Sequence, residues 1–194
     1  MTKSLTVRAD ATLDCQGLAC PMPIIKTKKA IEQLRAGQVV EIQATDKGSL
    51  ADLQGWTKNT GHHYLGTIHE GNVLKHYVRK AVANEMKEEI KFPQSIENEE
   101  LQKRLDANED CIVLDVREPA EFAFNHIPAA VSIPLGELAE RMHELNDGQP
   151  IYVICRTGNR SDMACRLLAE NGFGQVSNVV PGMSGWEGAT DAAV

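Results

Sequence analysis

The hydrophobic pattern of this 194-residue chain changes near residue 81, and this change limits the folds available to it. Before residue 81, alternating runs and amphipathic stretches follow one another, whereas after residue 95 the short runs are apolar on both faces. Charge divides at the same place, because residues 1–80 carry 11 basic and 7 acidic side chains and residues 81–194 carry 9 and 20. We therefore expect two α/β domains, 1–80 and 95–194, joined by a linker at 81–94.

The first domain is expected to contain two helices and four strands. Residues 4–14 alternate loosely, which indicates a strand, and the stretch after Cys20 has apolar residues at helical spacing until Gly37. The further predicted elements are a strand at Val39–Ala44, a helix at Ser49–Thr60 and a hairpin of Tyr64–Ile68 with Val73–Val78. The order βαβαββ predicts a two-layer sandwich with both helices on one face of the sheet.

The linker is expected to be helical from Ala81 to Lys91. It lacks turn-forming residues, and an apolar stripe recurs there every four positions, at Val78, Val82, Met86 and Ile90. The stripe favours packing against a neighbouring domain, and a dimer seam in a homo-oligomer is the alternative.

The second domain is expected to alternate short apolar strands with helices. The strands are predicted at Ile112–Val116, Val131–Ile133, Ile151–Ile154 and Val176–Val180, and the helical segments include Leu135–Leu145 and Asn159–Asn171. Strands that are apolar on both faces are typical of a parallel sheet covered by helices on both sides.

Composition narrows the class of protein. The net charge is −7, and no apolar run approaches the roughly 20 residues of a membrane helix. The first residues lack the apolar stretch of an export signal, and five scattered cysteines do not form the framework of a secreted domain. We therefore expect a soluble cytoplasmic protein with reduced thiols, no direct contact with nucleic acid or membrane, and no metal or cofactor.

Cys155 directly follows the apolar run Ile151–Ile154 and precedes Gly158 and a predicted helix. Open α/β sheets place ligand sites at this edge, where a loop and a helix N-terminus can surround one sulfur with backbone N–H groups. Arg156 and Arg160 add positive charge, which would stabilise a thiolate and an anion bonded to it. A buried strand-end cysteine beside two surface arginines is the structural alternative.

The segment Cys155-Arg156-Thr157-Gly158-Asn159-Arg160-Ser161 resembles the active-site loop of a single-domain rhodanese, a sulfurtransferase. Four further segments stand in that family's order, so the resemblance covers roughly residues 95–190: Leu114–Glu118, Glu121-Phe122, His126–Pro128 and Gly182–Trp186. The sequence departs from the family at Asn125 and Ala129, where glycine is usual, and at Pro181, which replaces the first glycine of a pair.

This resemblance implies that Cys155 is the catalytic nucleophile and that the substrate-binding loop consists of Arg156, Thr157, Gly158, Asn159 and Arg160. Cys155 would take sulfur from thiosulfate, glutathione persulfide or another low-molecular-weight persulfide, and pass it to a second thiol or to cyanide. The spacing from Cys155 to Arg160 is one residue shorter than the Cys-x5-Arg loop of phosphatases, which disfavours a phosphatase or an arsenate reductase. Cys111 and Cys165 are expected to be core residues.

Cys20 precedes Pro21 and Pro23, residues that suit the first turn of a helix. The thiol is therefore expected in the N-cap region, where the helix dipole would lower its pKa. Nearby lysines are expected to raise the local positive potential: Lys26, Lys28 and Lys29.

The segment Leu13–Ile24, with its Cys-Pro-x-Pro signature, resembles TusA-like (SirA-like) sulfur carriers. The likeness covers about residues 4–80 and implies that Cys20 carries sulfur as a persulfide and does not itself cleave thiosulfate. Cys15 leaves a metal pair or a regulatory disulfide with Cys20 as alternatives, although the sequence has no second ligand pair at zinc-like spacing.

Together the two resemblances predict a TusA-like domain fused to a rhodanese domain, an enzyme that loads sulfur on Cys155 and relays it to Cys20. Acceptor sulfur-carrier proteins are further expected partners. A non-enzymatic persulfide sensor or carrier is the alternative from another class, and turnover distinguishes the two.

Overall fold

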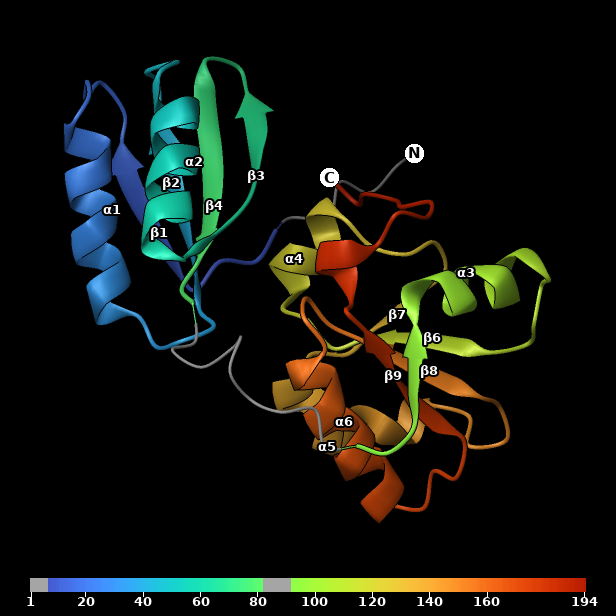
Figure 1. Cartoon of the computed structure of the whole chain (residues 1–194). Helices are drawn as coiled ribbons and strands as arrows, with labels where there is room; N and C mark the ends of the chain where they lie inside the picture. Colours follow the sequence, from blue (N-terminus) through green and yellow to red (C-terminus); the bar gives the residue numbers. More distant parts are fainter. Residues whose placement is uncertain (1–6, 82–91) are drawn as a thin grey trace. The chain divides into compact units, whose positions relative to one another are not determined.

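The computed structural model describes residues 7–81 and 92–194, which form two compact units (Figure 1). Within these ranges, none of the helices combines the length and the apolar character that crossing a lipid bilayer requires. Apart from Ala81, the predicted linker helix lies outside the described residues, and so does most of its apolar stripe. Val78, the first residue of that stripe, lies in a strand.

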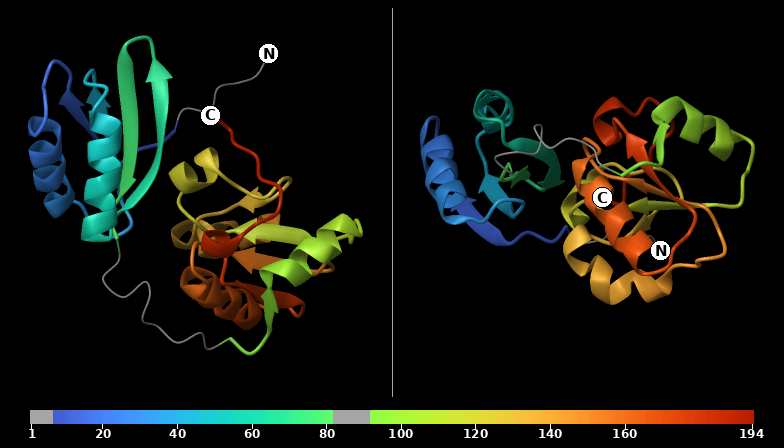
Figure 2. Two further views of the ribbon diagram at one scale, coloured as in Figure 1. Left: turned by 45° about the horizontal axis from the view of Figure 1, so that its top comes forward. Right: turned by 60° about the horizontal axis from the view of Figure 1, so that its bottom comes forward.

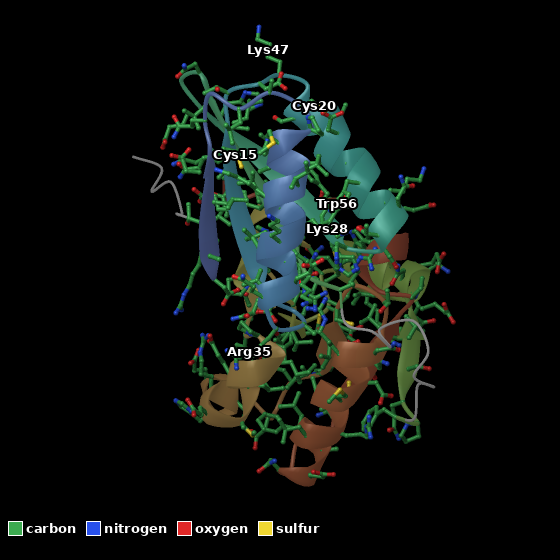
Figure 3. The ribbon with its side chains drawn as sticks, turned by 90° about the vertical axis from the view of Figure 1, so that its left-hand side faces the viewer. Cys15, Cys20, Lys28, Arg35, Lys47 and Trp56 are labelled. Atoms are coloured by element: carbon green, nitrogen blue, oxygen red, sulfur yellow. The ribbon has the colours of Figure 1, made fainter. Side chains whose placement is uncertain are left out.

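The first unit is a four-stranded sheet covered on one face by two helices, as the sequence predicts (Figure 3). The strand order is β1-β2-β4-β3, with β1 parallel to β2 and the other pairs antiparallel. The elements are β1 (Ala11–Cys15), α1 (Met22–Gln33), β2 (Val39–Ala44), α2 (Ser49–Thr60), β3 (His63–Glu70) and β4 (Val73–Arg79).

Both helices of this unit bury one side chain in every four. In α1 these are Pro23, Thr27 and Ile31, so one narrow stripe faces the sheet. The core beneath it contains Val40 and Ile42 of β2, which are fully buried. Because β1 and β2 are parallel and each leads into a helix, α1 and α2 begin at the same end of the unit, the end that carries Cys20 (Figure 3).

The second unit contains a five-stranded parallel sheet with the order β5-β9-β8-β6-β7. Its strands are β5 (Ser95–Glu97), β6 (Ile112–Asp115), β7 (Val131–Ser132), β8 (Ile151–Ile154) and β9 (Val176–Val180). Its helices are α3 (Asn98–Asp106), α4 (Pro119–Phe124), η1 (Leu135–Glu137), α5 (Leu138–Arg141), η2 (Met142–Glu144), α6 (Asn159–Glu170) and η3 (Met183–Gly185).

Helices cover both faces of this sheet, as the doubly apolar runs predict (Figure 2). Successive residues of β8 enter different cores. Val153 packs on one face in a cluster with Leu168 of α6, and Ile154 packs on the other in a cluster with Leu101 of α3. This alternation fixes which residue of the following loop points into which layer, and Cys155 falls on the α6 face.

The stretch predicted as one helix at Leu135–Leu145 is three short helices. The residues that reach the core explain the division, because their spacing alternates. Leu135 and Leu138 are three residues apart, which suits a 3₁₀ turn, whereas Leu138 and Met142 are four apart, which suits an α-helix. The interval from Met142 to Leu145 returns to three.

Two of the three departures from the rhodanese pattern, Ala129 and Asn125, replace a usual glycine, and their backbone conformations differ from each other. Ala129 has a φ of 62°, a left-handed conformation that favours glycine, so its side chain is strained there. Asn125 has a φ of −165°, which is extended backbone that any residue adopts. The usual glycine is therefore explained by geometry at Ala129 and not at Asn125.

Candidate active site and sulfur-carrier site

Cys155 lies at the carboxyl end of β8, in the loop that leads into α6. The loop closes at Gly158, whose φ of 93° allows the chain to turn back over the sulfur. Cys155 is 1% exposed, so its Sγ atom is enclosed by the protein. A thiol in this position faces the N-terminus of a twelve-residue helix, where backbone N–H groups point toward an anion.

The Sγ atom of Cys155 has two donor groups within hydrogen-bond distance. The backbone N–H of Gly158 donates to it at 3.2 Å, and the Ser161 hydroxyl lies 3.3 Å away. The Gly158 N–H is held by the loop, and the Ser161 side chain is held in the first turn of α6. Such donors stabilise negative charge on the sulfur or on an atom bonded to it.

Asn178 fixes the direction of the Ser161 hydroxyl. Its Nδ2 donates to the Gly158 carbonyl at 3.1 Å, which turns its Oδ1 toward Ser161, and the hydroxyl donates to that Oδ1 at 2.6 Å. With its proton on Asn178, Ser161 can accept the S–H of Cys155, and it donates to the sulfur only when that proton turns away from Asn178. Asn178 is fully buried in β9, and its signal in the sequence is a lone amide inside an apolar run.

Arg160 forms an ion pair with Glu121 of α4. Its two terminal nitrogens donate to the two carboxylate oxygens at 2.8 and 3.0 Å, and the side chains are 12% and 3% exposed. Glu121 also accepts the backbone N–H of Glu118, within a capping box that starts α4. Arg160 therefore ties the loop to α4, a role that the sequence analysis did not assign to it.

The other residues of the predicted substrate loop lie where the sequence places them. Arg156, Thr157 and Asn159 are half-buried, and each already has an interaction within the protein. Gly158 is buried. The structure thus brings the five predicted loop residues together around Cys155, with Arg160 already neutralised by a carboxylate.

The segment after β9 supports the backbone of Cys155. Met183 donates its N–H to the Cys155 carbonyl at 2.8 Å, and Ser184 donates to the Arg156 carbonyl at 2.9 Å. Gly182 passes so close that a Cβ there would lie 2.5 Å from the Cys155 oxygen. Gly182 also has a φ of 84° with a ψ of −160°, a conformation essentially restricted to glycine.

Cys20 lies at the opposite extreme of exposure. It is exposed to solvent and stands just before Pro21, the N-cap residue of α1 (Figure 3). Lys47 lies at the same end of the unit, between β2 and α2. Of the three lysines expected to act on Cys20, Lys26 instead donates to the Asp14 carbonyl at 3.2 Å.

The predicted lowering of the Cys20 pKa is wrong. A hydrogen bond from the thiol to the Asp52 carboxylate raises its pKa, with a further contribution from the charge of Asp46. Asp46 lies between β2 and α2, and Asp52 lies in the first turn of α2. The local sequence around Cys20 does not contain these carboxylates, which the fold brings to it.

A buried chain of hydrogen bonds anchors the segment that carries Asp46 to the sheet. The Ser49 hydroxyl donates to the Asp46 carbonyl at 2.6 Å, so the N–H at Nε2 of His76 donates to Ser49 Oγ at 2.9 Å. Nδ1 of His76 then accepts the Tyr64 hydroxyl at 2.7 Å. Burial lowers the pKa of His76 to about 4, so it stays neutral and keeps this chain intact near neutral pH.

The remaining three cysteines are buried or half-buried. Cys165 is fully buried in α6, and burial raises the pKa of its thiol strongly; Cys111 is half-buried against the α3 face. Cys15 is fully buried beneath α1, and burial raises the pKa of its thiol, whereas Cys20 is exposed. Among the described residues, no cluster of three or more histidine, cysteine or acidic side chains is placed to hold a metal ion.

A parallel sheet that presents an enclosed cysteine in a glycine loop at a helix N-terminus defines a rhodanese-like domain, and the βαβαββ unit with an exposed Cys-Pro-x-Pro thiol defines a TusA-like one. Comparison with known families agrees, because residues 97–189 match the rhodanese-like domain and residues 11–80 match the family described as sulfurtransferase TusA.

Relatives match either nearly the whole chain or one of its two parts. The Bacillus subtilis protein named "Putative sulfur carrier protein YrkF" is 49% identical over 185 residues, which cover 95% of this chain and all of that protein. The sulfur carrier protein TusA of Allochromatium vinosum is 36% identical over 72 residues, 37% of this chain and 95% of its own. A rhodanese-related crystal structure from Thermoplasma volcanium covers 50% of this chain and 97% of its own, with 33% identity and a TM-score of 0.47.

The chain therefore belongs to the family in which a TusA domain is fused to a rhodanese-like domain, a family of sulfur carriers and sulfurtransferases.

Proposed function

We propose that this protein takes sulfane sulfur from thiosulfate or a low-molecular-weight persulfide onto Cys155 and passes it to Cys20. The observation that carries the proposal is a buried sulfur at the N-terminus of α6 that accepts the Gly158 N–H at 3.2 Å and has the Ser161 hydroxyl 3.3 Å away. These groups favour the thiolate that attacks and the persulfide anion that results.

In the first step, the Cys155 thiolate attacks the outer sulfur of thiosulfate. A sulfur–sulfur bond forms to Cys155, the bond within thiosulfate breaks, and sulfite leaves with the electron pair. A persulfide donor reacts in the same way and leaves as its thiolate. The enclosure of Cys155, which is 1% exposed, supports donors that present a single small terminal sulfur to the loop.

In the second step, the Cys20 thiolate attacks the outer sulfur of the Cys155 persulfide. The new bond joins that sulfur to Cys20, and Cys155 leaves as a thiolate, ready for another donor. The exposure of Cys20 supports its role as carrier, because a carrier thiol must meet more than one partner. Tethering two domains in one chain can give an effective concentration in the millimolar range.

Intact-mass analysis of the whole chain after exposure to thiosulfate or glutathione persulfide tests the loading step. We expect one added sulfur at Cys155, with further sulfur at Cys20, each located by peptide mapping. Sulfur on neither cysteine would contradict the proposal. Labelling without turnover when cyanide is supplied would favour the non-enzymatic sensor.

Mixed variants test whether the relay runs within one chain. Cys155→Ser chains, which retain Cys20, are mixed with Cys20→Ser chains, which retain Cys155, and supplied with thiosulfate. Sulfur on Cys20 of the first chain would show transfer between chains. Its absence, with wild-type Cys20 labelled, would confine the relay to one chain.

A further inference from the structure

Positive and negative charges are matched in pairs at the edge of the rhodanese-like sheet that carries Cys155. Arg160, in the first turn of α6, donates from both terminal nitrogens to the Glu121 carboxylate at 2.8 and 3.0 Å. Arg117, just after β6, donates from Nη2 to the Asp115 carboxylate at 2.6 Å. The two carboxylate side chains are only 3% and 1% exposed. Both arginines therefore have a buried anion of their own.

Glu121 is held in place by its own helix as well as by Arg160. Its Oε2 atom accepts the backbone N–H of Glu118 at 3.0 Å, within the capping box that begins α4. An arginine that donates two parallel hydrogen bonds to a carboxylate forms one of the stronger pairs in proteins, and burial leaves this pair little screened by salt. The charge of Arg160 is therefore cancelled before a sulfur donor arrives.

This cancelled charge matters because two anions meet in the proposed loading step, the Cys155 thiolate and the donor. Thiosulfate has two negative charges on one small group, whereas the sulfur-bearing end of an organic persulfide or a thiosulfonate has one. Apart from Arg160, the loop contains a single full positive charge, that of Arg156, so it can offset at most one charge of a donor. The Gly158 N–H and the N-terminus of α6 add only partial charges.

We propose that Glu121 is a positioning residue that sets the choice of donor: by neutralising Arg160, it makes the Cys155 site favour donors with a single negative charge over thiosulfate. In the favoured reaction, the Cys155 thiolate attacks the terminal sulfur of an organic persulfide or thiosulfonate and forms a sulfur–sulfur bond to it. The bond within the donor breaks, and an organic thiolate or sulfinate leaves with the electron pair. This inference rests on the proposed function, because it concerns which donor loads Cys155.

Two donors that differ by one charge test the inference on the full chain. They are thiosulfate and methanethiosulfonate, in which a methyl group replaces one anionic oxygen. Both give their terminal sulfur to a thiolate, and cyanide then removes it as thiocyanate, so one assay serves both. The quantity to compare is the donor ratio, defined as kcat/KM for thiosulfate divided by kcat/KM for methanethiosulfonate at fixed ionic strength. Comparing this ratio between variants cancels the intrinsic reactivity of the two donors.

Glu121→Gln is expected to raise the donor ratio about fivefold or more, mainly through a lower KM for thiosulfate. Electrostatic attraction scales with the charge of the donor, so the restored charge of Arg160 helps the dianion more than the monoanion. Glu121→Asp, which keeps the carboxylate, should keep the wild-type ratio. Glu137→Gln is the matched control, because it removes a carboxylate from another ion pair of the same unit, the one with Arg141 at 2.9 Å.

The double variant Glu121→Gln/Arg160→Gln removes both charges at once, so neither is left buried without the other. Because the wild-type pair carries no net charge, we expect this variant to keep the wild-type donor ratio. A ratio about fivefold lower would show that Arg160 serves thiosulfate and would overturn the proposal. An unchanged ratio in Glu121→Gln, shown by thermal unfolding to be folded, would overturn it too. Sulfur transfer from neither donor in the wild type would instead contradict the proposed function.

Discussion

The two cysteines that the sequence singles out differ in nearly every physical respect. Cys155 is buried, follows a central parallel strand and accepts the Gly158 N–H on its sulfur, whereas Cys20 is exposed, precedes α1 and has its pKa raised by the Asp52 carboxylate. Donors stabilise a thiolate and an acceptor stabilises a thiol. The two sulfurs therefore differ in both their exposure and the groups that face them.

This contrast gives each unit its part in the proposed relay. A buried sulfur admits only small donors, and its surrounding loop is held by Asn178, Glu121 and the segment after β9. An exposed sulfur on the end of a helix can be reached by other proteins. The proposed relay thus combines selective loading with wide delivery.

Replacing each cysteine in turn should produce the largest difference. Cys155→Ser should abolish thiosulfate:cyanide sulfurtransfer, because a hydroxyl cannot form the persulfide on which both steps depend. Cys20→Ser is the matched control and should keep this activity, since cyanide takes sulfur directly from Cys155. A steady-state assay with cyanide checks both, and substantial activity in Cys155→Ser would refute its assignment as nucleophile.

Gly182→Ala should damage the Cys155 site through the backbone. The added Cβ would meet the Cys155 carbonyl at 2.5 Å, and the backbone conformation itself costs about 1–3 kcal/mol without glycine. Gly172→Ala is the control, because Gly172 also has a positive φ, of 94°, but has no atom within 4 Å of its Cβ position. We expect the first variant to lose at least tenfold in turnover and the second to lose only stability. Equal losses would contradict a role for Gly182 in supporting Cys155.

The two arginines of the loop should behave differently. Arg160→Ala removes the cation that forms an ion pair with the buried Glu121 carboxylate, which should lower the free energy of unfolding by about 3–5 kcal/mol. Arg156→Ala should instead raise the KM for thiosulfate about tenfold or more, with little change in stability. Denaturant unfolding and donor kinetics separate the two effects. An Arg156→Ala variant with unchanged KM would remove Arg156 from the binding site.

A smaller effect is expected at Cys20. Asp52→Asn removes the carboxylate that raises the pKa of Cys20, so more thiolate should be present at neutral pH. Alkylation of Cys20 by iodoacetamide, followed by peptide mass spectrometry, should become a few times faster, and its pH midpoint should move down. Asp46→Asn should show a weaker change in the same direction, because Asp46 acts through charge alone. Slower alkylation in Asp52→Asn would contradict this assignment.

Sequence periodicity predicted the elements that bury a regular stripe or a doubly apolar run. Ser49–Thr60, Ile151–Ile154 and Val176–Val180 occur with the predicted bounds. The sequence analysis did not identify β5, α3 or α4. α3 is mostly charged and buries only Leu101 and Asn98, so its pattern is too weak to identify it alone.

The site was predictable where its residues are neighbours in the chain. The loop from Cys155 to Arg160 is one segment, and the fold places it as expected. Asn178, Glu121 and Asp52 come from other elements, and only the fold brings them to the two cysteines. The prediction for the pKa of Cys20 was wrong for this reason. A carboxylate that is distant in the sequence raises this pKa more than the N-terminus of α1 lowers it.

Persulfide on Cys20 after a single exposure to thiosulfate tests the central claim most directly. Wild-type protein and the Cys155→Ser variant are treated alike, the chain is cleaved, and the peptide that contains Cys20 is weighed. The relay predicts added sulfur on Cys20 in the wild type and none in the variant. Equal labelling of Cys20 in both, or no labelling in either, would contradict it.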